Sequence, residues 1–163
     1  MQNNDVLRIF RYALNIPDTT MVNIFTTAGC KIDRSQLLNL LKKREEPNFV
    51  SCSSTLLEKF FDGLIIYNRG RQDDEPLKSS NQSVNRGKPQ PESLSNNLIL
   101  KKIRIALDLK QDDMIEIFRL GNVNVTKGEF TAMFRKEGHK NYKECGDQYM
   151  KKFLQGLAVR HRV

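Results

Sequence analysis

The side chains whose types and spacing best fit a chemical role lie in the second half of this sequence. Five cations follow one another there: Lys127, Arg135, Lys136, Lys140 and Lys143. Lysine and arginine neutralise phosphate groups, which supplies salt-dependent affinity for nucleic acid without reading its sequence. We therefore take these five residues of the basic segment, residues 127–143, as candidate nucleic-acid contacts.

A reactive thiol is the second candidate chemistry. Cys52 and Cys145 are expected at or near the start of a helix, where a thiol pKa is lowered. A catalytic cysteine also needs a base, and His139 is the only histidine nearby in sequence. A similar stretch occurs earlier in the chain, and there Glu46 stands at the position of His139. The cysteine–histidine pair is therefore not duplicated. The sequence therefore favours cysteines that pack as small apolar residues.

The sequence gives little support for a metal site, a cofactor site or another kind of enzyme chemistry. The three cysteines and two histidines show no close ligand spacing. There is no glycine-rich phosphate loop, no nucleophile elbow and no pair of carboxylates on a shared helix face. We predict no cofactor, no metal site and no enzyme activity. Arg11 and Arg104 are expected to form structural ion pairs between helices, with an anion contact as the alternative.

An internal repeat must position these residues. Residues 3–70 match residues 96–163 at an offset of 93 without a gap, with seventeen identical positions. A period this long indicates two copies of one supersecondary unit rather than a short solenoid repeat. We predict an all-α fold of two homologous four-helix units in tandem. Their boundaries are 1–70 for the first helical repeat, 71–95 for a flexible linker and 96–163 for the second.

Apolar residues recur in each copy at spacings of three and four, the period of a helix. The first helix is expected from about Asn4 to Asn15, with Asn4 and its counterpart Asn97 as N-caps. The second is expected over 18–28 and 112–120. Gly29 and Gly121 follow it, in positions suited to the left-handed conformation that ends a helix.

The third helix has the clearest start. Thr126 and Glu129 fit a capping box, and Asp33 and Gln36 form its looser counterpart. The predicted ends of this helix are basic: Lys42, Lys43 and Arg44 in one copy, Arg135 and Lys136 in the other.

The fourth helix is expected to begin near Cys52 or Cys145 and to reach about Asn68 or His161. It carries Gly63 or Gly156 in its middle, where glycine costs about 1 kcal/mol relative to alanine. This cost, present in both copies, predicts that another helix crosses closely there.

The second and third helices of a copy would together resemble a helix-turn-helix, which places its second helix in the DNA major groove. Ile24, Ala28 and Cys30 fall at plausible apolar positions around Gly29. The turn up to Asp33 is longer than the compact version of the motif. In the second copy, the five cations would then contact phosphates.

Charge is unevenly distributed along the chain. The net charge is +8; residues 1–75 hold ten Lys and Arg against ten Asp and Glu, whereas residues 96–163 hold fourteen against eight. The basic second copy favours an anionic partner, nucleic acid above all, and a merely solvated surface is the alternative.

Size and composition set further bounds. One copy alone would bury only about 60% of its unfolded surface, so the copies should pack on each other or on a second chain. No apolar run approaches the roughly 20 residues that span a membrane. Polar residues follow Met1, and three cysteines argue against a disulfide framework. We therefore expect a cytoplasmic protein without a membrane partner.

Several segments resemble the YehS-like family of bacterial proteins. They are 4–14 and its echo 97–107, together with 114–118, 141–145 and 153–157. The resemblance covers both copies and implies a tandem arrangement of a domain of uncharacterised function, with no site residues to carry over. The first copy departs from the pattern at Pro47 to Ser53, so the second copy is the better place to look for a site.

These observations favour a regulatory binding protein that is not an enzyme, with nucleic acid as its ligand. The alternative is a protein-interaction module that acts through helix grooves or dimerisation, because a single copy is marginal in size. A third hypothesis is an enzyme that depends on a cysteine or a small ligand.

Overall fold

The computed structural model describes residues 2–69, 95–136 and 138–162, and every regular element within them is a helix. The helices are α1 (Asn3–Leu14), α2 (Asp18–Thr27), α3 (Arg34–Leu40), α4 (Ser54–Arg69), α6 (Asn96–Leu107), α7 (Gln111–Leu120), α8 (Lys127–Met133) and α9 (Asp147–Arg162). Each helix of the first copy begins and ends 93 residues before its counterpart. The predicted all-α tandem repeat is thereby confirmed. The predicted linker lies outside the described residues except for Ser95, whose hydroxyl caps α6 by accepting from the Leu98 amide.

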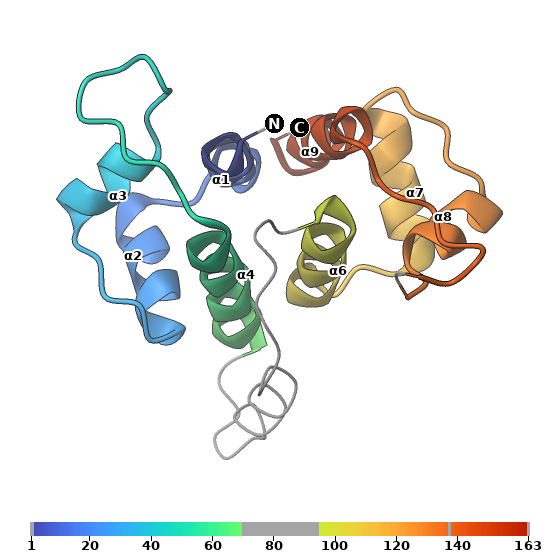
Figure 1. Ribbon diagram of the computed structural model, residues 1–163, viewed down its shortest axis with the longest axis horizontal. Helices are drawn as coiled ribbons and strands as arrows, with labels where there is room; N and C mark the ends of the chain where they lie inside the picture. The colour runs from blue at the N-terminus through green and yellow to red at the C-terminus, as the bar shows by residue number, and fades with distance from the viewer. Residues whose placement is uncertain (1, 70–94, 137, 163) are drawn as a thin grey trace.

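The two copies interlock through their first and fourth helices. Helix α1 packs chiefly against α9 of the other copy, and α6 packs in the same way against α4. Figure 1 shows these four helices in the middle of the molecule, with α2 and α3 at one end and α7 and α8 at the other. The buried apolar side chains of both copies form one core. The expectation that the copies pack on each other is confirmed.

Polar contacts also join the copies. The Lys102 ammonium of α6 lies 2.6 Å from the Asp62 carboxylate and 3.6 Å from that of Glu58, both on α4. The Asn68 side-chain amide donates to the Ala106 carbonyl over 2.8 Å. At the equivalent positions of the α1–α9 pair, Ile9 replaces Lys102, Gln155 replaces Asp62 and Lys151 replaces Glu58. These residues cannot form the same ion pair, so this charged contact is specific to α4 and α6.

Glycines allow the second and fourth helices of each copy to cross closely, as predicted. A Cβ atom on Gly63 would lie 2.1 Å from the Ile24 carbonyl oxygen of α2, and one on Gly156 would lie 1.8 Å from that of Ile117 in α7. These distances are far below van der Waals contact. Glycine is therefore required at both crossings.

The turn after the second helix differs in part from its prediction. Gly29 has the expected left-handed conformation, with φ of +83°. Gly121 was expected to do the same, which is wrong: its φ is −90°, and Asn122 takes the left-handed position instead. A Cβ on Gly121 would lie 2.1 Å from the Lys152 carbonyl oxygen. Gly121 therefore serves the approach of α9 and not the turn.

The third helices start as predicted and end earlier. Thr126 and Glu129 form a reciprocal capping box, and Asp33 and Gln36 form its counterpart. Helices α3 and α8 contain seven residues each and end at Leu40 and Met133. The prediction that they end in basic residues is wrong, because those cations lie in the loops that follow.

Candidate functional site

The five cations of the basic segment lie on one helix and the loop after it. Lys127 is the first residue of α8, and the other four lie in residues 134–146, between α8 and α9. Four of the side chains are exposed and that of Lys143 is half-buried. None of the five forms an ion pair with another described residue. No described carboxylate therefore neutralises these five positive charges.

A buried asparagine holds both ends of the loop that carries these cations. The Asn97 side chain of α6 donates to the Met133 carbonyl over 2.8 Å and to the Lys143 carbonyl over 2.9 Å. Its amide oxygen accepts from the Cys145 backbone N–H over 2.8 Å. Three hydrogen bonds of one side chain thus tie the end of α8 to the segment just before α9.

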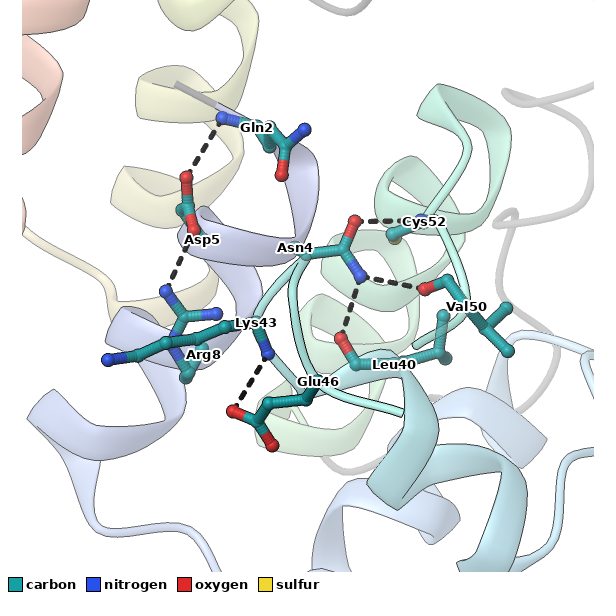
Figure 2. Close-up of polar contacts among 9 residues, drawn as sticks. All are labelled: Gln2, Asn4, Asp5, Arg8, Leu40, Lys43, Glu46, Val50 and Cys52. Carbon is teal, nitrogen blue, oxygen red and sulfur yellow. Dashed lines mark hydrogen bonds and ion pairs between the residues drawn. The ribbon is translucent and has the colours of Figure 1, made fainter. Parts of the chain in front are cut away.

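Figure 2 shows the same arrangement in the first copy, where the Asn4 side chain lies between the carbonyls of Leu40 and Val50 and the amide of Cys52. The prediction that Asn4 and Asn97 are N-caps is wrong. Gln2 and Ser95 occupy the N-cap positions, one residue before Asn3 and Asn96. An asparagine near the start of an amphipathic helix suits a cap, but these side chains face the core.

The neighbouring asparagines extend the contact to the fourth helices. Asn96 donates to the Cys145 carbonyl and to the Asp147 carboxylate, both over 2.9 Å. Asn3 donates to the Cys52 carbonyl over 3.0 Å. The paired asparagines and the cysteine, identical in the two copies, thus form one loop-holding unit in each.

Lys143 is held more firmly than the other cations. Its ammonium lies 5.4 Å from the centre of the Tyr149 ring on α9, within the range of a cation–π contact. Its backbone N–H donates to the Ala132 carbonyl over 3.0 Å. Lys143 therefore presents a fixed charge beside the more exposed Lys140.

The two repeated cysteines are buried ahead of the fourth helices. Cys52 and Cys145 are 3% and 1% exposed and lie two residues before α4 and α9, not within them. The pKa of each thiol is raised to about 12, by burial at Cys52 and by burial together with the carboxylates of Asp147 and Glu144 at Cys145. Each thiol lies 3.6–3.7 Å from the carbonyl of the next residue. His139 is exposed, and its Nδ1 accepts from the Asn141 backbone N–H over 3.0 Å.

Alkylation provides a direct check on these thiols. Iodoacetamide at mildly alkaline pH should modify the half-buried Cys30 of the native protein and leave Cys52 and Cys145 intact, because the reagent attacks thiolates. All three cysteines should react once urea unfolds the chain. Peptide mass spectrometry assigns the modified positions. Rapid labelling of native Cys145 would contradict the burial described above.

Arg11 and Arg104 occupy equivalent places but have different partners. The Nε of Arg11 donates to the Ile16 carbonyl, and that of Arg104 donates to the Leu109 carbonyl. Arg11 also forms the predicted ion pair, with Asp18. Arg104 forms no ion pair with a described residue, so the prediction is confirmed for Arg11 alone. The offset of 93 places Gln111 opposite Asp18, a difference that the sequence could have revealed.

In both copies, the connection between the second and third helices is longer than a helix-turn-helix requires. Six residues, 28–33 or 121–126, separate the second helix from the third. Helix-turn-helix motifs join their helices by about three or four residues. The backbone of these helices therefore does not form the compact motif. Any argument for nucleic-acid binding by the basic segment depends on its charges instead.

Two general findings concern metal binding and membrane spanning in the described part of the chain. Its described residues contain no group of three or more His, Cys, Asp or Glu side chains placed to hold a metal ion. None of its helices combines the length and the apolar character needed to span a membrane.

Comparisons with known proteins agree with the repeat. Residues 3–70 and 96–162 each match the family described as "Protein of unknown function (DUF1456)". The chain is 36% identical over 163 residues to "Uncharacterized protein YehS" of Escherichia coli (strain K12), with 100% of this chain and 98% of that protein covered. No solved structure matches it. The chain therefore belongs to this family of proteins of unknown function, as its resemblance to YehS-like proteins predicted.

Proposed function

We propose that this protein binds nucleic acid in the cytoplasm, as a regulatory binding protein and not as an enzyme. The contact surface is the basic segment: Lys127 on α8 and the four cations of the loop that follows. These residues neutralise phosphates and so contribute affinity that falls with salt and depends little on base sequence.

The observation that carries this proposal is the state of the five cations. No described carboxylate lies within ion-pair distance of any of them. They lie at the end of the molecule that α7 and α8 occupy, away from the packing of the two copies (Figure 1). Four of the five are exposed and so accessible to a nucleic-acid backbone.

The first copy offers a contrast in the same place. The loop after its third helix, residues 41–53, holds three cations and two glutamates, whereas the equivalent loop of the second copy, residues 134–146, holds four cations and two glutamates. The Glu46 carboxylate accepts from the Lys43 backbone N–H over 3.2 Å and so remains beside those cations. The second copy is consequently the stronger candidate for an anionic ligand.

Two further features support a binding role. The thiols of Cys52 and Cys145 have pKa values of about 12, and such thiols contribute little nucleophilic thiolate near neutral pH. All three cysteines are free, which suits a reducing compartment such as the cytoplasm.

A protein partner or homo-oligomer is the alternative. It was motivated by the marginal size of one copy, but in the structure each copy already covers the other through α1–α9 and α4–α6. The need for a second chain is therefore weaker, and the unneutralised cations favour nucleic acid.

Binding should be measured by fluorescence anisotropy with mixed-sequence DNA and RNA, single- and double-stranded. Four phosphate contacts predict a loss of affinity of about a hundredfold between about 50 and about 200 mM salt. Replacing the four exposed cations of the basic segment by alanine should remove most of the binding and flatten this salt dependence.

A matched variant removes four exposed cations from the first copy: Lys31, Lys43, Arg44 and Lys59. The same net charge is lost, so a general electrostatic attraction would weaken equally in both variants. We expect the first-copy variant to retain most of the affinity. Equal losses in the two variants would refute the assignment of the surface, and no binding at low salt would refute the function.

A further inference from the structure

In the first copy, a single carboxylate joins three helices. Asp18, the first residue of α2, accepts from Arg11 Nη2 over 2.5 Å and from Arg34 Nε over 3.1 Å. Its side chain is 18% exposed. Two cations on α1 and α3 thus converge on two oxygens of one anionic group. Phosphate oxygens meet arginine side chains through the same kind of charged hydrogen bond.

The second copy retains the surroundings of this carboxylate and lacks the carboxylate itself. Arg104 replaces Arg11 in the last turn of α6, and Lys127 replaces Arg34 as the first residue of α8. The first residue of α7, however, is Gln111 in place of Asp18. All three helices begin and end at equivalent residues, so the second copy has a neutral amide at the position of the anion that joins the two cations in the first copy.

Arg104 is held in place without an ion pair to any residue that the structure describes. Its Nε donates to the Leu109 carbonyl over 3.0 Å, as Arg11 donates to Ile16 over 2.9 Å. The centre of its guanidinium lies 5.3 Å and 5.4 Å from the ring centres of Phe130 and Phe134. A cation–π contact orients the planar group but leaves its positive charge in place. The first copy has Leu37 and Leu41 at these two positions.

The space beside this position is sufficient for a small anion in the first copy. An open hollow of about 220 Å³ lies against Asp18 and Arg34, with Thr19, Val22 and Asn23 along its wall. This volume is several times the roughly 30 Å³ share of one water molecule. The equivalent wall in the second copy bears Asp112 and Glu116. Glu116 forms an ion pair with Arg119 over 2.6 Å and Asp113 forms one with Arg160 over 3.3 Å, so among these acids only Asp112 has no ion pair to a described residue.

We propose that the second copy binds a phosphate group between Arg104 and Lys127, in the place that the Asp18 carboxylate fills in the first copy. This inference rests on the proposed nucleic-acid function and gives that surface one defined phosphate contact. The ligand chemistry is a phosphate oxygen, supplied either by a nucleic-acid backbone or by a free phosphorylated molecule. Gln111 donates or accepts through its amide and adds no repelling charge.

Exchange of the two residues at this position tests the proposal. NMR of the full chain should show saturable shifts of the Arg104 Nε–H and the Lys127 amide on titration with inorganic phosphate, against chloride at equal ionic strength. Gln111→Asp supplies the missing carboxylate and should weaken phosphate binding by about tenfold or more. Asp18→Gln should create the corresponding response at Arg11 in the first copy.

Gln111→Asn is the matched control, because it has the size of the aspartate variant without its charge, and it should retain binding. Asp112→Asn should strengthen binding. Absence of shifts at Arg104 and Lys127 in the wild-type protein overturns the proposal. Equal phosphate affinity in the aspartate and asparagine variants of Gln111 also overturns it.

A titration with a short oligonucleotide separates the two sources of phosphate. Shifts at Arg104 and Lys127 with both ligands support a backbone contact. Shifts at Arg104 and Lys127 with inorganic phosphate, and none at any residue with the oligonucleotide, support the binding position and refute the nucleic-acid function. Oligonucleotide shifts confined to Arg135, Lys136 and Lys140 refute this phosphate position and leave the broader surface standing.

Discussion

Replacing Gly156 by alanine is expected to destabilise the protein by about 2–3 kcal/mol. Alanine normally stabilises a helix interior by about 1 kcal/mol relative to glycine. Here its Cβ would lie 1.8 Å from the Ile117 carbonyl oxygen and 3.0 Å from the Gly121 amide nitrogen. Both are backbone atoms of α7 or its end, so α7 and α9 would have to move apart and loosen the core between them.

Urea unfolding of the full chain, followed by circular dichroism, measures this effect. Gly128→Ala is the matched control within a helix, because its nearest neighbour would be the Thr126 hydroxyl at 3.9 Å. That variant should be neutral or slightly more stable. Gly63→Ala should resemble Gly156→Ala, since its Cβ would lie 2.1 Å from the Ile24 carbonyl oxygen. An unchanged midpoint for Gly156→Ala would show that the helices cross less closely.

Replacing Asn97 by alanine is expected to cost about 3 kcal/mol or more, because three backbone groups lose their partner. They are the carbonyls of Met133 and Lys143 and the amide of Cys145. Buried polar groups without partners cost about 1–3 kcal/mol each. The loop that carries the basic segment would also lose its fixed ends, so nucleic-acid affinity should fall with stability.

Hydrogen exchange at the Cys145 amide reports the loss of this contact directly and should accelerate in the variant. Asn141→Ala removes an exposed asparagine from the same loop and should leave both exchange and stability nearly unchanged. Asn4→Ala should reproduce the stability loss in the first copy, where Leu40, Val50 and Cys52 would be left unpaired. Wild-type stability in the Asn97 variant would show that other groups hold the loop.

Features encoded by neighbouring residues were predictable from the sequence. The capping box at Thr126 and Glu129 spans three residues and formed as expected. The mid-helix glycines Gly63 and Gly156 indicated close crossings, because a repeated cost in helix propensity implies a compensating contact. The all-α repeat followed from the apolar spacing and the offset of 93.

Features that depend on residues far apart in the sequence could not be predicted from it. Asn4 resembles an N-cap locally, but its partners lie 36 to 48 residues away. Gly121 resembles a helix-ending glycine, yet the α9 backbone determines its role. The contacts of Arg104 with Phe130 and Phe134 depend on how α6 meets α8. In the basic segment, the sequence indicated the cations, and the fold supplied the asparagine that fixes their loop.

The pairing of α1 with α9 and of α6 with α4 has a consequence for how the chain tolerates change. Each half contributes helices to the core of the other, as the two subunits of a dimer do when they pack on each other. A substitution at Gly63, where α4 crosses α2, would therefore be expected to destabilise the second copy together with the first. Because each half is stabilised by packing on the other, exposed residues of the two halves can differ without changing the shared core.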